Sequence, residues 1–217
     1  MRHSPVDMVV VSREYGAGGS EFAGLLGERL GWYVFDRDII ERVAERLHVA
    51  AGIVESRDEQ CPGWMARIAS SLMISPPESP TILDTSGVLT PDAIAEAANA
   101  AILAAANAPP VIIVGHGSQY IFRERPGTFQ VRISAPVEAR LDRIIARDGG
   151  SREEAAAHAR RMDNQRQAYV QRYYHHYWGD PVLFDAQFNS ARVTIEEATA
   201  CVASVIAGRR YDAITES

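Results

Sequence analysis

Short, continuous apolar runs alternate with stretches of helical periodicity along most of the chain. A continuous apolar run is typical of a strand buried on both faces, as in parallel sheets. Apolar residues at helical spacing follow most of these runs. The first such stripe ends at Gly31, a residue type that commonly stops helices. The sequence therefore predicts an α/β fold in which helices cover both faces of a parallel sheet. The predicted strands are Met8–Ser12, Trp32–Phe35, Val111–Val114, Phe129–Ile133 and Phe184–Phe188.

Two stretches interrupt this alternation. Residues 49–92 are divided by five prolines, and residues 148–180 are polar, aromatic and rich in arginine. Because neither contains a repeat or a flexible linker, we expect insertions on one core and a single domain over residues 1–217. An alanine-rich helix is predicted over residues 91–106. Its small side chains suit either packing in a core or pairing across a homodimer.

The chain contains no lysine: all 22 of its Lys and Arg residues are arginine, against 28 acidic residues, for a net charge of −6. Schiff-base and pyridoxal-phosphate chemistry through a lysine are therefore excluded. A polyanion must be bound by arginine, by backbone N–H groups or by a metal ion. The acidic balance argues against nucleic-acid and membrane partners. Because the chain shows neither a signal-peptide run nor an apolar run of about 18 residues, we expect a cytoplasmic protein.

A glycine-rich turn joins the first predicted strand to the first helix. Glycine lets backbone N–H groups approach a phosphate closely, and a helix N-terminus adds unpaired donors. Compared with the phosphate-binding motif G-x-x-x-x-G-K-[ST], Gly18 matches the second glycine and Ser20 matches the hydroxyl that meets Mg²⁺. Arg13 stands at the first glycine, and Gly19 stands at the lysine. The position at the carboxyl end of a strand favours phosphate binding, because ligands of open α/β sheets bind there.

Two other interpretations of this turn stay open. It can be a tight strand-to-helix turn that needs glycine for its backbone alone. It can also belong to a dinucleotide fold, for which Gly16-x-Gly18 and Asp36 are partial matches. Against the dinucleotide fold, Glu21 stands where the third glycine would fall, and Asp36 comes early.

Residues 140–172 contain eight arginines. Arg140, Arg143 and Arg147 lie beside the apolar stripe of one helix, and we expect them to form its solvated face. Two other arginines, Arg160 and Arg166, can share a helical face with Asp163 because the three are spaced three residues apart. Arginine binds phosphate oxygens in bidentate fashion, so this second group is typical of a phosphate clamp. The alternative is an exposed ion-pair ladder of little energetic weight.

Aromatic residues follow the arginines: Tyr169, Tyr173, Tyr174, Tyr177 and Trp178, with His175 and His176 among them. A base-stacking platform is one interpretation, and packing of the segment's own small core is the favoured one. The adjacent histidines have no nearby ligand set with metal spacing, so no metal site is predicted there.

Four segments together resemble the cytidylate kinase-like proteins, which are P-loop kinases: strand–SREYGAGGSE–helix, VIIVGHGS, the Arg160/Asp163/Arg166–Tyr169 block and FDAQFNSARVTIEEA. The resemblance extends from about residue 8 to residue 207. It implies a three-layer α/β/α P-loop kinase core, an acceptor-binding helical insertion over 49–107 and an arginine-rich lid over 148–180. It also implies ATP and Mg²⁺, with nucleotides or similar small molecules as substrates.

The resemblance also assigns residues. The donor phosphates would lie on Tyr15, Gly16, Ala17, Gly18, Gly19 and Ser20, and Ser20 would meet Mg²⁺. The acceptor would be bound by Asp36, Arg42, His116, Asp163 and Arg166. Asn189-Ser190 resembles the Asp-Thr-Ser segment after the family's last core strand. Cytidylate kinase has Gly-Arg-Asp after its third core strand, and this chain has Gly115-His116-Gly117, which argues against CMP as the acceptor.

Phosphoryl transfer depends on in-line placement, a metal ion and positive charge around the transferred group. We expect arginines to replace the charge of the missing lysine, with Arg13, Arg160, Arg161 and Arg166 as the candidates. The predicted activity is transfer of the γ-phosphoryl of ATP to a nucleoside monophosphate or a similar acceptor. Two alternatives stay open: a nucleotide-binding protein with little or no kinase activity, and a kinase for a non-nucleotide alcohol, in which Asp36 would take the proton.

Overall fold

The computed structural model describes residues 5–36, 99–100 and 102–215, with side chains described as far as Arg209. By their contacts, Met1–Asp36 and Pro109–Ser217 form one unit, and Arg37–Ala108 forms a second. In the second unit the described residues 99–100 and 102–106 are helical, as the alanine-rich pattern predicts. Of the predicted insertion, 49–107, residues 49–98 and 101 lie outside the described residues, as does Arg42. Division of the chain into one domain with an insertion and a lid stays a prediction.

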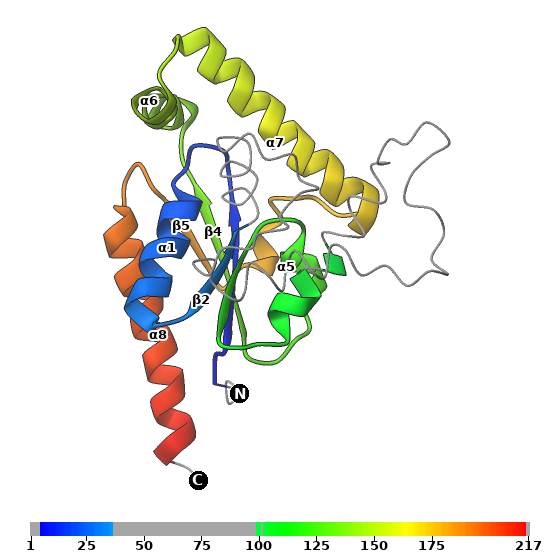
Figure 1. The fold of residues 1–217 in the computed structure, drawn as a ribbon, viewed down its shortest axis with the longest axis vertical. Coiled ribbons are helices and arrows are strands. Elements are labelled where there is room, and N and C mark those ends of the chain that lie inside the picture. The colour runs from blue at the N-terminus through cyan, green and yellow to red at the C-terminus, as the bar shows by residue number, and fades with distance from the viewer. Residues whose placement is uncertain (1–4, 37–98, 101, 216–217) are drawn as a thin grey trace, which may run out of the picture. The chain divides into compact units, whose positions relative to one another are not determined.

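The first unit is built on a five-stranded sheet in the order β2-β3-β1-β4-β5 (Figure 1). All neighbouring strands are parallel. Their bounds are β1 Met8–Arg13, β2 Tyr33–Asp36, β3 Val111–Val114, β4 Thr128–Ser134 and β5 Ala186–Asn189. The strands predicted from the apolar runs are confirmed within a few residues. Val11 pairs with Val114, and Val114 pairs with Asp36, so the carboxyl ends of β1, β2 and β3 meet at one edge.

Helices cover both faces of this sheet, as predicted. Helix α1, Gly19–Leu30, and helix α8, Ile195–Thr215, lie on one face, and the short helix α5, Ser118–Ile121, lies on the other (Figure 1). Helix α1 ends at Gly31, whose left-handed φ of 66° stops the helix. The main core is packed between the sheet and α1 and α8; its largest buried members include Phe22, Leu26, Ile112, Ile133 and Ile206.

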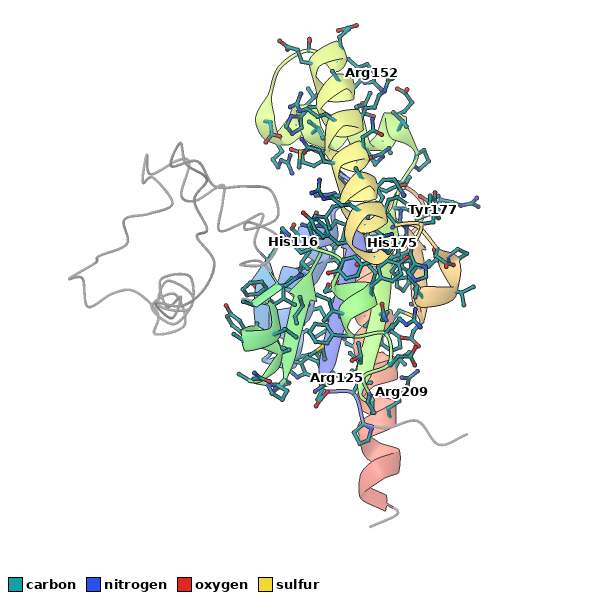
Figure 2. The ribbon with its side chains drawn as sticks, turned by 90° about the vertical axis from the view of Figure 1, so that its right-hand side faces the viewer. His116, Arg125, Arg152, His175, Tyr177 and Arg209 are labelled. Carbon is teal, nitrogen blue, oxygen red and sulfur yellow. The ribbon has the colours of Figure 1, made fainter. Side chains whose placement is uncertain are left out.

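Two further helices form a hairpin at the carboxyl edge of the sheet. Helix α6 spans Val137–Asp148, and helix α7 spans Arg152–Tyr174. Ser151 and Glu154 begin α7 with reciprocal capping hydrogen bonds. The hairpin has a small core of its own, made of Leu141, Ile144, Ala155 and Ala159, against which Tyr15 of the β1–α1 turn packs. Figure 2 labels Arg152 at one end of α7 and His175 just past the other. No helix in the described part of the chain is long and apolar enough to cross a membrane.

Candidate phosphoryl-transfer site

The glycine-rich turn between β1 and α1 has a backbone conformation that favours glycine at two positions. Gly16 and Gly18 have φ values of 78° and 89°, which residues with a side chain rarely adopt. The turn is also packed tightly from outside. A Cβ on Gly16 would lie 2.8 Å from Cγ1 of Ile144, and one on Gly18 would lie 2.8 Å from Cδ1 of Ile195. Backbone conformation and packing therefore both require these glycines.

The turn ends at the N-terminus of α1, which begins at Gly19 with Gly18 as its N-cap. No side chain caps this end, so the first N–H groups of the helix donate to no capping side chain. Ser20 lies in the first turn of α1 and is half-buried. The N–H groups of a helix N-terminus therefore lie at the turn for which phosphate binding is predicted, and Ser20 lies beside them.

Arg13, the last residue of β1, crosses the carboxyl edge of the sheet. Its side chain begins against Gly19, where an added Cβ would overlap Cβ of Arg13. Its guanidinium ends over Gly115, where an added Cβ would overlap Nη1. Nη2 of Arg13 lies 3.6 Å from Oδ1 of Asp36 at the end of β2, and both side chains are almost completely buried. Two of the predicted residues, one from the donor side and one from the acceptor side, are therefore an ion pair.

Asp163 of α7 is bound to the glycine-rich turn. Its Oδ1 accepts a hydrogen bond of 2.9 Å from the backbone N–H of Tyr15. Its Oδ2 accepts one of 2.5 Å from Nη1 of Arg140, which also donates to the carbonyl of Tyr15 at 3.2 Å. The backbone of Tyr15, the carboxylate and the guanidinium thus form a closed ring of hydrogen bonds. Asp163, predicted to bind the acceptor, therefore joins α7 to the turn that is predicted to bind the donor.

Arg166 lies on the same side of α7 and contacts the turn as well. Its Nη1 donates to the carbonyl of Arg13 at 3.0 Å, and its guanidinium lies 5.7 Å from the centroid of the Tyr15 ring. Asp163 and Arg166 therefore share a face, as predicted. Arg160, predicted to share it, does not contact the turn; it is exposed.

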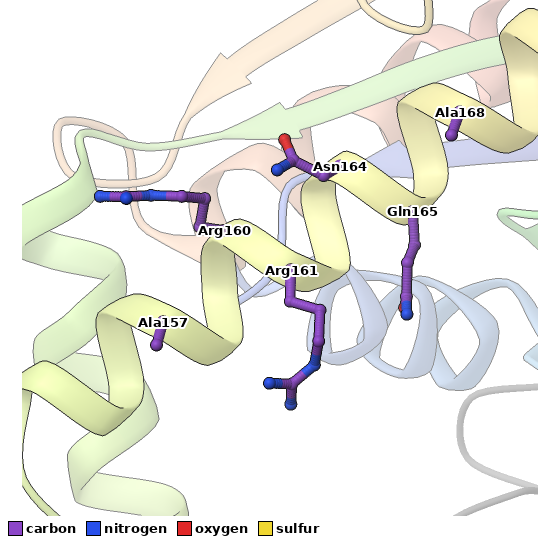
Figure 3. Close-up of a pocket in the computed structure, with 6 residues that line it drawn as sticks. All are labelled: Ala157, Arg160, Arg161, Asn164, Gln165 and Ala168. Atoms are coloured by element: carbon purple, nitrogen blue, oxygen red, sulfur yellow. The ribbon is translucent and has the colours of Figure 1, made fainter.

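A shallow groove runs along the exposed face of α7 (Figure 3), lined by Ala157, Arg160, Arg161, Asn164, Gln165 and Ala168. Arg161 and Gln165 point to the same side of the helix in this view. Nη2 of Arg161 lies 2.6 Å from Nδ1 of His158. Both arginines are exposed and can meet a soluble anion.

The expectation that Arg140 and Arg143 form a solvated face of α6 is wrong. Arg140 is only 8% exposed and binds Tyr15 and Asp163. Nη1 of Arg143 donates to the carbonyl of Ala17 at 2.8 Å and to Oγ of Ser190 at 2.9 Å. These residues could not be found from their spacing, because a helical repeat shows which side chains share a face and not what covers that face. Arg147 is exposed, as expected, and donates to the Tyr15 hydroxyl at 2.9 Å.

A charged network lies beneath the turn. The carboxylate of Glu14 accepts from the N–H of Ala135 at 3.1 Å and lies 3.8 Å from both Arg132 and Arg140. Arg132 is buried, with its guanidinium 4.6 Å from the Trp178 ring. Burial lowers the pKa of Arg132, and the charge of Glu14 counteracts part of that effect. The network fixes the base of the turn to β4.

The turn after β3 is constrained from both sides. Gly115, His116 and Gly117 have φ values of 77°, 56° and 72°, and a left-handed histidine is uncommon. A Cβ on Gly117 would overlap the ring of Tyr174, so this turn lies between that ring and the Arg13 guanidinium. Strained backbone of this kind often accompanies a binding role.

Aromatic rings hold the end of α7 to this turn. Tyr120 stacks on Tyr174 and His176 at centroid distances of 5.5 and 4.8 Å, and Tyr169 lies 6.5 Å from His116. The Tyr120 hydroxyl donates to the carbonyl of Tyr177 at 2.6 Å, and burial raises its pKa to about 12. Tyr169 and Tyr174 thus pack against His116 and Tyr120, outside residues 148–180, and Tyr177 is 65% exposed, so these aromatics do not form a core of that segment alone.

The residues present fit ATP and Mg²⁺. The uncapped helix N-terminus and the left-handed glycines suit phosphate, and Ser20 provides one hydroxyl oxygen. Among the described residues, no group of three His, Cys, Asp or Glu side chains could hold a metal ion. A Mg²⁺ ion held by one hydroxyl and by substrate phosphates needs no such group.

Comparison with known proteins agrees with this geometry. A profile of the cytidylate kinase-like family matches residues 8–192. No sequence among curated proteins matches the chain. A solved structure described as an uncharacterized protein from Eubacterium ventriosum is similar with a TM-score of 0.56 and 18% identity, covering 92% of this chain and 97% of that one.

Two shikimate kinases have the same fold. The Bacteroides thetaiotaomicron enzyme is similar with a TM-score of 0.50 and 12% identity, over 92% of this chain and 97% of that one. The Acinetobacter baumannii enzyme, solved with shikimate, has a TM-score of 0.50 and 11% identity, over 94% of each chain. The core is therefore a P-loop kinase-like α/β fold. Since the family profile matches most of its length, the chain belongs to the cytidylate kinase-like family.

Proposed function

We propose that this protein is an ATP-dependent phosphotransferase that moves the γ-phosphoryl of ATP to a nucleoside monophosphate or a similar small acceptor. Family membership and the kinase fold support phosphoryl transfer. The donor phosphates would lie on the turn from Tyr15 to Ser20. Mg²⁺, held by Ser20 and those phosphates, would neutralise charge developing on the transferred group.

The observation that carries this proposal is the position of the Arg13 side chain. The ordinary motif has glycine at its first position and lysine at its seventh. Here the seventh position, Gly19, has no side chain, and the side chain of the first position covers it. The two positions have exchanged roles, so a cation still crosses the site from the donor turn towards Asp36. Positive charge across the site is what phosphoryl transfer needs, and this supports an enzyme over a nucleotide-binding protein without activity.

Asp36 is proposed to orient the acceptor. Its carboxylate is buried beside the Arg13 guanidinium at the end of β2, where it can accept a hydrogen bond from the acceptor. His116, in the strained turn after β3, would contact the acceptor from the neighbouring strand. Arg42 is proposed to bind an acceptor phosphate on the family resemblance alone.

Arg160, Arg161 and Arg166 are proposed to supply charge to the transferred phosphoryl group from α7. An arginine placed on that group in the transition state can be worth about 10³–10⁵ in rate. Arg166 already contacts the donor turn, whereas Arg160 and Arg161 line the groove on the exposed face of α7 (Figure 3). Two of the three would therefore have to reach the phosphates when substrate binds.

The test combines binding with turnover. Calorimetric titration with ATP–Mg²⁺ measures donor binding, and a coupled ADP-release assay across nucleoside monophosphates and small alcohols identifies the acceptor. We expect binding and acceptor-dependent ADP release. Binding without turnover on every acceptor would favour a nucleotide-binding protein, and turnover on alcohols alone would identify a small-molecule kinase. Absence of ATP–Mg²⁺ binding would overturn the proposal.

A further inference from the structure

We propose that Arg143 is a positioning residue that orients the donor turn from behind and gives it a positive charge, with Ser190 as its partner. This inference rests on the proposed donor site at residues 15–20. It concerns two residues for which the sequence pattern predicted no such part. Neither residue would touch the reacting atoms.

The peptide group between Ala17 and Gly18 is held by its carbonyl, which fixes where its N–H points. A peptide unit is planar and, in this turn, trans, so its C=O and N–H point in opposite directions. Arg143 and Ser190 both donate to the carbonyl of Ala17, at 2.8 and 2.7 Å. That carbonyl is therefore held towards α6 and the β5–α8 turn. The N–H of Gly18, in the same peptide unit, must point the opposite way, into the turn where the phosphates would lie.

Arg140 orients a second peptide group in the same way, the one between Tyr15 and Gly16. It holds the carbonyl of Tyr15 at 3.2 Å, so the N–H of Gly16 points away from α6. Two guanidinium groups from one helix thus fix two peptide planes, and between them they aim two N–H donors to one side. The intervening N–H, of Ala17, donates to the carbonyl of Glu14, so the N–H groups of Gly16 and Gly18 are the two that these arginines orient.

Arg140 and Arg143 differ in whether a carboxylate offsets their charge. Arg140 is neutralised by Asp163 at 2.5 Å and lies 3.8 Å from Glu14. The bonds of Arg143 go to neutral oxygens: the Ala17 carbonyl, and the hydroxyl and carbonyl of Ser190. Within the described part of the chain, no carboxylate forms a salt bridge with Arg143. Nη1 of Arg143 lies 2.9 Å from the position of a Cβ on Gly18, directly behind the turn. In a protein without lysine, this is a full positive charge against the phosphate site.

Ser190 completes the arrangement. Its hydroxyl donates to Ala17 and accepts from Arg143, and it is only 8% exposed. Because Arg143 also donates to Ala17 directly, loss of the Ser190 hydroxyl removes one of two donors and leaves the charge. The serine should therefore matter less than the arginine.

The experiment is calorimetric titration of the full chain with ATP–Mg²⁺ and separately with inorganic tripolyphosphate, which has phosphates and no base. Arg143→Gln keeps an amide donor and removes the charge, and Arg143→Lys keeps a charge. We expect Arg143→Gln to weaken both ligands by about tenfold to a hundredfold, the loss expected of a charge-assisted hydrogen bond. Arg143→Lys should lose less, and Ser190→Ala less still. Arg123→Gln is the control, since Arg123 is exposed and pairs with its neighbour Glu124.

The outcomes separate this inference from the proposed function. If the unsubstituted protein binds neither ligand, the proposed function fails, and the inference fails with it. If it binds both and Arg143→Gln binds them equally well, only the inference is overturned. Weakened ATP with unchanged tripolyphosphate also overturns it, because the effect would then lie on the base. Thermal unfolding of each variant is measured alongside. If Arg143→Gln does not fold, the test is whether Arg143→Lys weakens ligand binding more than Ser190→Ala does, and the reverse order overturns the inference.

Discussion

Arg13 and Gly19 exclude each other's side chains: a Cβ on Gly19 would overlap Cβ of Arg13 and lie 2.7 Å from its Cγ. In the ordinary phosphate-binding motif the side chain belongs to the seventh position, and the first is glycine. The overlap involves Cβ of residue 13 itself, so removing only the guanidinium would not relieve it. The two positions must therefore change together.

The first prediction is a double-mutant cycle on unfolding. Gly19→Ala alone should destabilise the protein by about 1–3 kcal/mol, the usual cost of overpacking. In an Arg13→Gly background the same substitution should be neutral or stabilising by about 0.4–1 kcal/mol, because alanine lowers the entropy of the unfolded chain. The free energies of unfolding in urea give the coupling between the two sites. Equal costs in the two backgrounds would show that the side chains do not compete.

The second prediction concerns the effect of Arg13 and Gly19 on catalytic activity. Arg13→Gly should lower kcat by about a hundredfold or more, because the cation that crosses the site is lost. Arg13→Gly with Gly19→Lys restores the ordinary motif and should recover part of that loss. The measurement is ADP release with the acceptor identified in the panel. A double variant no faster than Arg13→Gly would count against the exchanged roles of the two positions.

The third prediction concerns Asp163. Asp163→Ala should destabilise the protein by about 2–3 kcal/mol, since it leaves the Tyr15 N–H without its acceptor and removes the carboxylate nearest to the Arg140 guanidinium. Asp163→Asn keeps an oxygen for Tyr15 and should lose about 1 kcal/mol less. Urea unfolding measures both variants.

The matched control for Asp163 is Asp142→Asn on α6. Asp142 also pairs with an arginine, Arg152, at 2.8 Å, but both groups are exposed. Its loss should change the free energy of unfolding by no more than about 0.5 kcal/mol. If Asp142→Asn and Asp163→Asn lower the free energy of unfolding by the same amount, the hydrogen-bond ring around Tyr15 does not stabilise the fold.

The strands and the donor turn could be predicted because their signals are local. A buried strand such as Val111–Val114 needs apolar side chains on both faces, and a turn with positive φ needs glycine. The partners of the turn could not be predicted, because they come from distant parts of the chain. Asp163 lies 148 residues from Tyr15, and Arg143 lies 126 residues from Ala17. Helical spacing placed Asp163 and Arg166 on one face correctly, yet it gave no reason to prefer Arg143 over the exposed Arg147.

The fourth prediction is a pH dependence of stability. Burial, followed by the charge of Arg161, lowers the pKa of His158, with Arg147 acting the same way and Asp148 opposing. The ring of His158 packs edge-on against Tyr15, with centroids 4.7 Å apart. Because the folded pKa is depressed, the unfolded chain binds more protons below its own pKa of about 6.5. Stability is therefore fully present above that pH and falls as the pH drops through the folded pKa.

The test for His158 compares melting temperatures at pH 7.5 and 5.5. The unsubstituted protein should melt at a lower temperature at pH 5.5, and His158→Gln should reduce that difference. His175→Gln is the control, since His175 is exposed just beyond the end of α7. A difference that survives in His158→Gln would assign the pH dependence to other groups.

The fifth prediction separates two kinds of arginine on α7. Arg160 and Arg161 are exposed, so their replacement by alanine should change the free energy of unfolding by no more than about 0.5 kcal/mol. Arg166 binds the carbonyl of Arg13 and lies against the Tyr15 ring, so Arg166→Ala should cost about 1–2 kcal/mol. If all three supply charge to the transferred phosphoryl group, each variant should lower kcat by at least about tenfold. Urea unfolding and single-turnover ADP release measure the two effects independently. Wild-type turnover in both Arg160→Ala and Arg161→Ala would leave Arg13 and Arg166 as the cations of the site, because the groove on the exposed face of α7 would then have no part in the reaction.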